Sequence, residues 1–223
     1  MTFIDPNSFA RLVDPCLYDL PGGVFYSSPA AFSTPSKIYL LGLNPGGSAE
    51  PNTEATVGRN LAIWRQREAG WSEYTSERWE GAEPGEYGIQ RPIRALFKRL
   101  GLNVADVPAS NAVFVRSNNE DKLDRKVELL QRCWPVHEAV IRDLGVTTVL
   151  CLGGTAGRWV RSMLGANRLH DHFRESYPRR HYRSEAHLSS DGIAVLTLAH
   201  PCRSDWRDVR ADPSPLVLRV LAR

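Results

Sequence analysis

The chain has 223 residues, of which 42% are hydrophobic and 24% are charged, and its formal net charge is +3. This ordinary globular balance predicts a single folded core. No stretch approaches the roughly 18 to 20 apolar residues that a bilayer-spanning helix needs, which excludes a membrane-embedded protein.

The N-terminal sequence MTFIDPNSFARLVDPCLYDL contains no cationic leader followed by an apolar segment, so we expect a soluble, cytoplasmic protein without a membrane partner. The cysteines lie far apart with no C-x-x-C pair, which argues against a zinc ribbon, an iron–sulfur cluster and a disulfide framework. We expect a monomer with no metal and no organic cofactor. The cysteines are Cys16, Cys133, Cys151 and Cys202.

Arginine carries most of the positive charge, because only four of the 28 Lys and Arg residues are lysine. The segment from Arg158 to His187 holds seven arginines against three acidic residues, a local excess of +4. Guanidinium groups suit phosphate, so this segment is either a phosphate-facing surface or a solvated basic loop. Its arginines are Arg158, Arg161, Arg168, Arg174, Arg179, Arg180 and Arg183.

Residues 1–36 are rich in Pro, Gly and Ser, and we expect an extension, with one short helix, that packs on a domain formed by residues 37–223. Apolar and β-branched runs within that domain predict strands, and apolar residues at helical spacing predict helices. In chain order the predicted elements are a strand at 37–42, helices at 59–70 and 89–100, a strand at 110–116, a helix at 123–144 that Pro135 interrupts or kinks, a strand at 147–152, a helix at 155–164 and a strand at 192–198.

Strands that alternate with helices and end in Gly, Asn or His predict a mainly parallel sheet. We therefore expect an α/β fold, a three-layer α/β/α sandwich around four or five strands. Ligands of such sheets bind beyond the carboxyl ends of the strands.

The first strand ends in the run Gly42-Leu43-Asn44-Pro45-Gly46-Gly47. Glycine lets the backbone approach a ligand closely, and proline fixes the turn that aims the Asn44 side chain. The same run is also common as a plain turn.

The last strand ends in His200-Pro201-Cys202-Arg203-Ser204, which a helix signal at Ser204-Asp205 follows. A neutral imidazole in this position can donate a hydrogen bond to a carbonyl oxygen that gains negative charge. A structural histidine is the alternative.

Asn111 stands at the start of the strand predicted at 110–116. Its amide offers one acceptor and two donors, so it can read a base edge with adjacent N–H and C=O groups. A strand-entry residue is the alternative.

These motifs occur in a characteristic order: GLNPGGSAE, an Asn-led strand SNAVFV, VLCLGGTAGRWV, and AHP at a strand end. In this order, over about residues 37 to 206, the chain resembles the uracil-DNA glycosylase superfamily. The first motif is similar to that of its mismatch-specific and single-strand-selective branches, and the His-Pro is similar to the second motif of the single-strand-selective branch.

The resemblance implies an enzyme of base excision repair that flips a deaminated base, such as uracil, out of DNA and hydrolyses the bond to its sugar. Asn44 would position water or the sugar, His200 would stabilise charge on uracil O2, and Asn111 would read the N3–H and O4 edge. Further substrate contacts are implied for Gly42, Leu43, Pro45, Gly46 and Pro201. Contacts to DNA are implied for Arg203 and Ser204.

Two positions depart from the family pattern. Cys202 replaces a serine, and Thr56 stands where an aromatic residue would stack on the base, with Trp64 and Trp71 as alternative stacking partners. These departures keep two other hypotheses open: a glycosylase-like protein that binds nucleic acid or a nucleotide without cutting it, and a hydrolase of free nucleosides or nucleotides.

Overall fold

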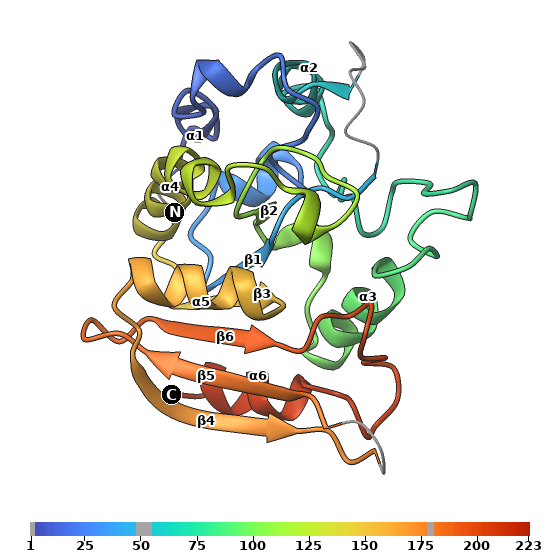
Figure 1. Cartoon of the computed structure of the whole chain (residues 1–223), viewed down its shortest axis with the longest axis vertical. Helices are drawn as coiled ribbons and strands as arrows, with labels where there is room; N and C mark the ends of the chain where they lie inside the picture. Colours follow the sequence, from blue (N-terminus) through green and yellow to red (C-terminus); the bar gives the residue numbers. More distant parts are fainter. Residues whose placement is uncertain (1–2, 48–54, 178–180) are drawn as a thin grey trace.

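The computed structural model describes residues 3–47, 55–177 and 181–223. One sheet runs through it in the order β2-β1-β3-β6-β5-β4, with helices on both faces (Figure 1). The strands are β1 (Ile38–Gly42), β2 (Ala109–Asn111), β3 (Thr148–Leu152), β4 (Arg168–Arg174), β5 (Arg183–Leu188) and β6 (Ala194–Leu198). The helices are α1 (Asn7–Ala10), α2 (Val57–Trp64), α3 (Gln90–Arg99), α4 (Lys126–Asp143, which contains Pro135), α5 (Gly154–Met163) and α6 (Ser214–Leu221).

Strands β2, β1, β3 and β6 run parallel to one another, whereas β5 pairs antiparallel with both of its neighbours, β6 and β4. Strands β1 and β3 are buried along their whole length, which their continuous apolar runs require. The predicted three-layer α/β fold with a mainly parallel sheet is therefore confirmed. The sheet has six strands rather than the expected four or five.

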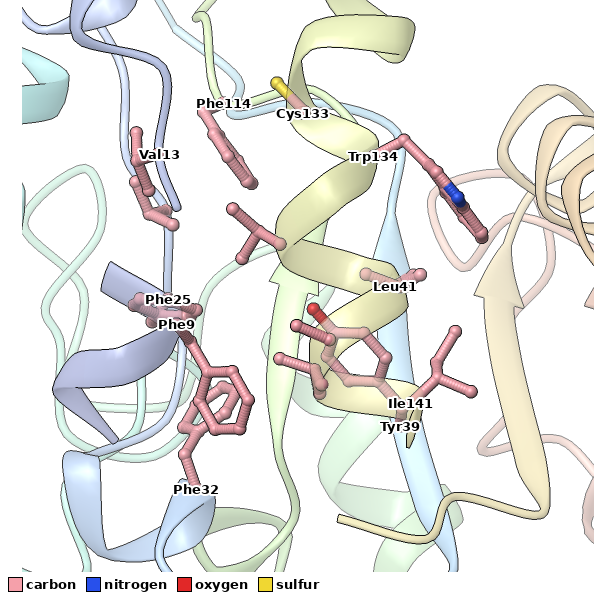
Figure 2. Packing of buried hydrophobic residues seen from close by; sticks show 14 of the residues in the cluster. Phe9, Val13, Phe25, Phe32, Tyr39, Leu41, Phe114, Cys133, Trp134 and Ile141 are labelled. Atoms are coloured by element: carbon pink, nitrogen blue, oxygen red, sulfur yellow. The ribbon is translucent and has the colours of Figure 1, made fainter. Parts of the chain in front are cut away.

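Alternate residues of the parallel strands enter two separate cores. Tyr39 and Leu41 face a core shared with α4, α5 and the N-terminal segment (Figure 2). Ile38 and Leu40 face the opposite core, which α3 and α6 cover. The period-2 alternation of β1 thus holds both helical layers against one sheet.

Residues 3–36 pack into the first core through Phe9, Phe25 and Phe32. Part of this segment also runs antiparallel to the free edge of β2, where Phe25 bridges Ser110 and the Tyr26 N–H donates to the Ala109 carbonyl at 2.8 Å. The segment therefore supplies both core residues and an added edge to the sheet.

Arg158 and Arg161 lie on α5, in agreement with the helix predicted at 155–164. The loop expected after that helix is wrong for most of its length, because residues 168–174 and 183–188 form the antiparallel pair β4 and β5, and β5 extends the sheet beyond β6. Strand β4 lies at the edge with mostly exposed polar and charged side chains, a composition that protects sheet edges but gives little apolar signal. Arg179 and Arg180 lie outside the described residues.

The helix signal at Ser204-Asp205 is also wrong. The Asp205 and Asp208 side chains accept hydrogen bonds from the backbone N–H groups of Arg207 and Arg210, which closes local turns there. The next helix, α6, starts only after Pro213. Among the described residues, no helix has the length and apolar character to cross a bilayer.

His137 on α4 makes the fold sensitive to pH. The side chain is buried between the sheet and α4, where its Nδ1 lies 2.8 Å from the Tyr39 hydroxyl. Desolvation by burial lowers the pKa of His137 to about 4. The unfolded chain, with a histidine pKa of about 6.5, binds more protons than the folded chain between these values.

We predict that this residue contributes full stability above about pH 6.5 and that roughly 3 kcal/mol of the free energy of unfolding is lost as pH falls towards 4. Denaturant unfolding at a series of pH values measures this loss. His137→Phe should flatten the profile, whereas His172→Gln, on the exposed edge strand, should leave it unchanged. A His137→Phe variant as acid-sensitive as the parent would contradict the prediction.

Candidate active site at the carboxyl edge of the sheet

A cavity of about 680 Å³ lies where β1, β2, β3 and β6 end. Asn44, Asn111 and His200 all line it, although they come from three different strand ends. Its volume is in the range of pockets that bind small organic ligands. Seven of the predicted site residues line the cavity: Gly42, Leu43, Asn44, Gly46, Asn111, His200 and Arg203.

The Asn44 amide is held in one orientation. Its Nδ2 donates to the Pro45 carbonyl at 2.9 Å and to Ser117 Oγ at 2.9 Å, and it lies 3.5 Å from the Val115 carbonyl. Because the two carbonyls only accept, the NH₂ group must face them. Within the described residues no donor reaches Oδ1.

Asn111 lies across Gly42 on the neighbouring strand. The two residues are partners in the register of β1 and β2, and a Cβ on Gly42 would stand 2.1 Å from Asn111 Oδ1. Asn111 is 4% exposed, its amide lies beside the Tyr26 hydroxyl, and within the described residues its Nδ2 makes no hydrogen bond of normal geometry. A buried unpaired N–H group costs about 1–3 kcal/mol, so this amide is ready for an acceptor from a ligand.

The cavity is also lined by four aromatic residues that the sequence did not indicate, of which Tyr182 is one. The other three, Tyr26, Tyr74 and Trp79, lie together, with ring centroids 5.8 Å apart for Tyr26 and Tyr74 and 6.5 Å apart for Tyr74 and Trp79. Tyr26 reaches the cavity because its segment pairs with β2 beside Asn111. Together the rings form a wall against which a flat heterocycle can pack.

Three residues considered as stacking partners in the sequence do not line the cavity. Thr56 caps α2 by accepting from the Arg59 N–H at 3.2 Å, which explains a small polar residue there. Trp64 is buried in the core and donates to the Ser27 carbonyl. Trp71 packs under the Arg67 guanidinium. Sequence position alone gave no means to separate these roles.

His200 has a defined tautomer. Its Nδ1 accepts from the Cys202 backbone N–H at 3.2 Å and lies 2.9 Å from the Cys202 Sγ. A backbone N–H can only donate, so the proton of the neutral ring is on Nε2. Burial, with a smaller contribution from Arg203, lowers the pKa of His200, while Glu120 opposes the shift. The ring is thus a neutral hydrogen-bond donor at neutral pH.

Gly153, between β3 and α5, packs directly against this ring. Its φ is +97°, and an added Cβ would lie 3.2 Å from His200 Cδ2. The positive φ favours glycine, and a side chain here would press on the imidazole. The Gly-Gly pair of the sequence motif therefore shapes the wall beside the imidazole.

Glu120 also lines the cavity, in the polar run Asn118-Asn119-Glu120. Its carboxylate accepts from Thr155 Oγ1 at 2.7 Å and from Lys126 Nζ at 2.9 Å, contacts that outweigh desolvation and lower the pKa of Glu120. The sequence analysis missed this run. Its position directly after an apolar strand was a signal that could have found it.

Three predicted site residues fall outside the cavity lining. Pro45 and Pro201 are buried, and Pro45 accepts from Asn44 as described. Ser204 was predicted to contact DNA, but it is 2% exposed and its hydroxyl donates to the buried Glu175 carboxylate. That prediction is corrected, since the serine anchors the loop from within. Residues 48–50 of the first motif lie outside the described residues.

Among the described residues, no group of three or more His, Cys, Asp or Glu side chains is arranged to hold a metal ion. No protein-family model matches the chain, and a search of curated proteins found no match. Fold and site together define the class: a mainly parallel α/β protein with a cavity, lined by aromatic rings and by polar side chains of the strand ends, at the carboxyl edge of its sheet.

The contact between Gly42 and Asn111 yields a prediction. Gly42→Ala should displace the Asn111 amide and lower the free energy of unfolding by about 1–3 kcal/mol. Combining it with Asn111→Ala should recover much of this loss, because the clashing amide is gone. Gly46→Ala is the matched control, since its Cβ would meet nothing within 4 Å. If denaturant unfolding showed that the double variant loses the sum of the free energies lost by the two single variants, the contact between Gly42 and Asn111 would be refuted.

The environment of His200 yields a second prediction. Its NMR titration midpoint should lie below the ordinary value of about 6.5. Arg203→Ala should raise the midpoint by removing a positive charge, and Glu120→Gln should lower it by removing a negative one. Lys37→Ala, at the opposite edge of the sheet, should leave it unchanged. A midpoint at or above 6.5 in the parent protein would show that the ring is not held neutral.

Proposed function

We propose that the protein is a DNA glycosylase that hydrolyses the bond between the sugar and uracil, or a related deaminated base. The observation that carries the proposal is the set of hydrogen-bonding groups around one cavity: an unpaired donor on Asn111, a donor on His200 Nε2 and an acceptor on Asn44. The order of motifs that resembles the uracil-DNA glycosylases supports it from the sequence.

The donors match the two carbonyl groups of uracil. The unpaired Nδ2 of Asn111 would donate to O4, and its Oδ1 would accept from N3–H. Cytosine presents a donor where uracil presents O4, so the unpaired Asn111 N–H discriminates between them if its amide keeps this orientation. The aromatic wall of Tyr26, Tyr74 and Trp79 would cover the face of the flipped base.

The leaving base carries negative charge, and His200 would stabilise it. A neutral Nε2–H donates to uracil O2 as the glycosidic bond lengthens and electrons move onto the ring. Because the pKa of His200 is lowered, the imidazole donates a hydrogen bond without transferring its proton near neutral pH.

Asn44 would orient the water that adds to the sugar. Its Oδ1 can accept a hydrogen bond from water, but an amide is a poor general base. The proposed reaction is therefore dissociative: the bond to the base breaks first, the sugar becomes cationic, and the positioned water then attacks C1′. DNA is the proposed partner, and a cytoplasmic location remains a prediction.

The test is base release from uracil-containing single- and double-stranded oligonucleotides, read as alkali-labile abasic sites. Removal of one donor to a developing charge costs about 10²–10³ in rate, which we expect for His200→Ala. His172→Ala, on the edge strand, is the matched control. No release of any deaminated base from DNA would reject the proposal, and release from free nucleosides alone would favour a nucleoside hydrolase.

Asn44 provides a sharper test of the water-positioning role. Asn44→Ala should slow base release while leaving uracil binding largely intact. Asn44→Asp should not rescue the rate, because one carboxylate oxygen would face the carbonyls of Pro45 and Val115, where the amide NH₂ now donates. Single-turnover rates of the two variants measure this. An aspartate variant faster than the parent would show that the residue acts as a general base.

A further inference from the structure

A second hollow, which we call the α3 cleft, lies between α3 and the loop that follows β6. It has a volume of about 560 Å³ and is lined by four basic residues and one carboxylate. None of its lining side chains is aromatic. The lining residues are Glu86, Arg91, Arg94, Ala95, Lys98 and Arg207.

The α3 cleft follows from the amphipathic pattern of its helix. Ile93, Leu96 and Phe97 enter the core beneath the sheet, so the opposite face of α3 points outward. Arg91, Arg94 and Lys98 stand at helical spacing on that outer face. Three cations are thus aligned on one rigid element.

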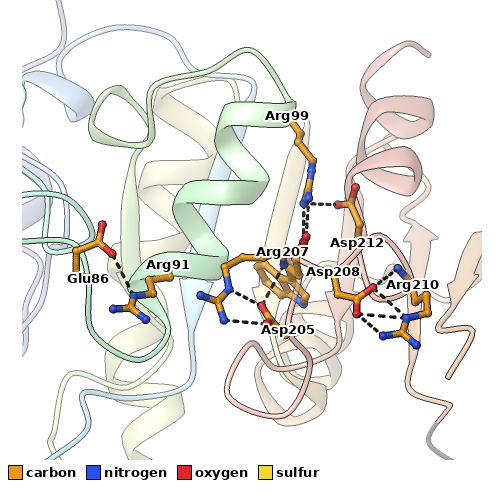
Figure 3. A network of polar contacts seen from close by, with 9 residues as sticks. Glu86, Arg91, Arg99, Asp205, Arg207, Asp208, Arg210 and Asp212 are labelled. Atoms are coloured by element: carbon orange, nitrogen blue, oxygen red, sulfur yellow. Dashed lines mark hydrogen bonds and ion pairs between the residues drawn. The ribbon is translucent and has the colours of Figure 1, made fainter.

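Arg99, on α3, fixes the loop after β6, which forms the second wall of the cleft, to the helix that forms the first. Its guanidinium donates to the carbonyls of Trp206 and Arg207, the latter at 2.9 Å, and pairs with Asp212 at 3.3 Å (Figure 3). The Trp206 indole in turn donates to the Ala199 carbonyl, next to His200. The loop is therefore held between α3 and the strand end of the candidate active site.

Positive charge in the α3 cleft exceeds what its own carboxylate can neutralise. Glu86 pairs with both Arg91 and Arg94, and the two guanidinium groups lower the pKa of its carboxyl. Arg207 pairs with Asp205 at 2.7 Å. Within the described residues, Lys98 has no ion-pair or hydrogen-bond partner for its ammonium group. The cleft thus retains capacity to bind an anion.

The same two segments of the chain, the start of α3 and the loop after β6, line both the α3 cleft and the active-site cavity. Ile89, at the start of α3, lines the cavity, and Arg91, two residues later, lines the cleft. On the loop, Arg203 lines the cavity and Arg207 lines the cleft. A chain of phosphates that leaves the cavity past these residues would enter the cleft.

We propose that the α3 cleft binds the phosphodiester backbone of the DNA strand whose base occupies the cavity. The inference rests on the proposed function and extends it by naming a second contact on the same strand. Guanidinium groups match phosphate geometry, and the lack of aromatic side chains predicts contact with the backbone rather than with bases. Binding in the cleft is therefore independent of sequence.

Fluorescence anisotropy with a uracil-free single-stranded oligonucleotide tests the α3 cleft without requiring catalysis. In Arg91→Ala/Lys98→Ala we expect roughly tenfold weaker binding and a slope of log affinity against log salt that is shallower by about 1 to 1.5. Lys37→Ala/Arg142→Ala is the matched control, because both residues are exposed and lie away from the cleft. Unchanged thermal unfolding verifies that both double variants are folded.

Turnover distinguishes failure of the inference from failure of the proposed function. The cleft variant should raise KM for a long uracil-containing strand with little change in kcat, and only when the strand extends to one side of the uracil. If Arg91→Ala/Lys98→Ala bound the oligonucleotide with the same affinity and salt slope as the control double variant, the proposed DNA binding in the α3 cleft would be rejected. Polyglutamate serves as a probe for an acidic protein partner. If the cleft variant lost binding to polyglutamate but bound DNA as the parent does, the proposal would be rejected in favour of such a partner. If the cleft substitutions weakened DNA binding but the parent protein released no base, the glycosylase function would be rejected and the DNA-binding role of the α3 cleft would stand.

Discussion

Parallel pairing of β1 with β2 and β3, and of β3 with β6, is the constraint on which the candidate site depends. Strands that run in one direction end at one edge, so segments far apart in sequence deliver their terminal polar residues to the same place. The register then sets the fine geometry: Gly42 stands opposite Asn111, and the missing side chain of one makes room for the amide of the other. A shift by one residue would separate them.

Two of the polar groups at this edge, Asn44 and His200, have their orientation fixed by backbone atoms. Carbonyls of Pro45 and Val115 hold the Asn44 NH₂ group, and the Cys202 N–H sets the tautomer of His200. Fixed dipoles of this kind need little reorganisation when charge develops on a ligand, which is the main way that proteins stabilise such charge. The unpaired Asn111 amide is the complementary case, an unfavourable group that a ligand would satisfy.

The layered fold, the four parallel strands and the positions of Asn44 and His200 after strand ends were predictable, because a continuous apolar run that stops at Gly, Asn or His is typical of a buried parallel strand. Asn111 was expected at the start of its strand, whereas it is the last residue of β2. The β4–β5 pair was missed since its alternation is masked by charged side chains on an edge. Tyr26 was missed for another reason. Its segment is irregular, and only its pairing with β2, a contact distant in sequence, brings the ring beside Asn111.

The pairing of residues 22–26 with the outer edge of β2 has a consequence for how the cavity comes into existence. The Tyr26 ring is made early in synthesis and the His200 imidazole late, and the cavity needs both. A polypeptide that stops before β6 contains most of the cavity lining but lacks His200. The complete cavity therefore requires the last parallel strand, β6, to pair with β3.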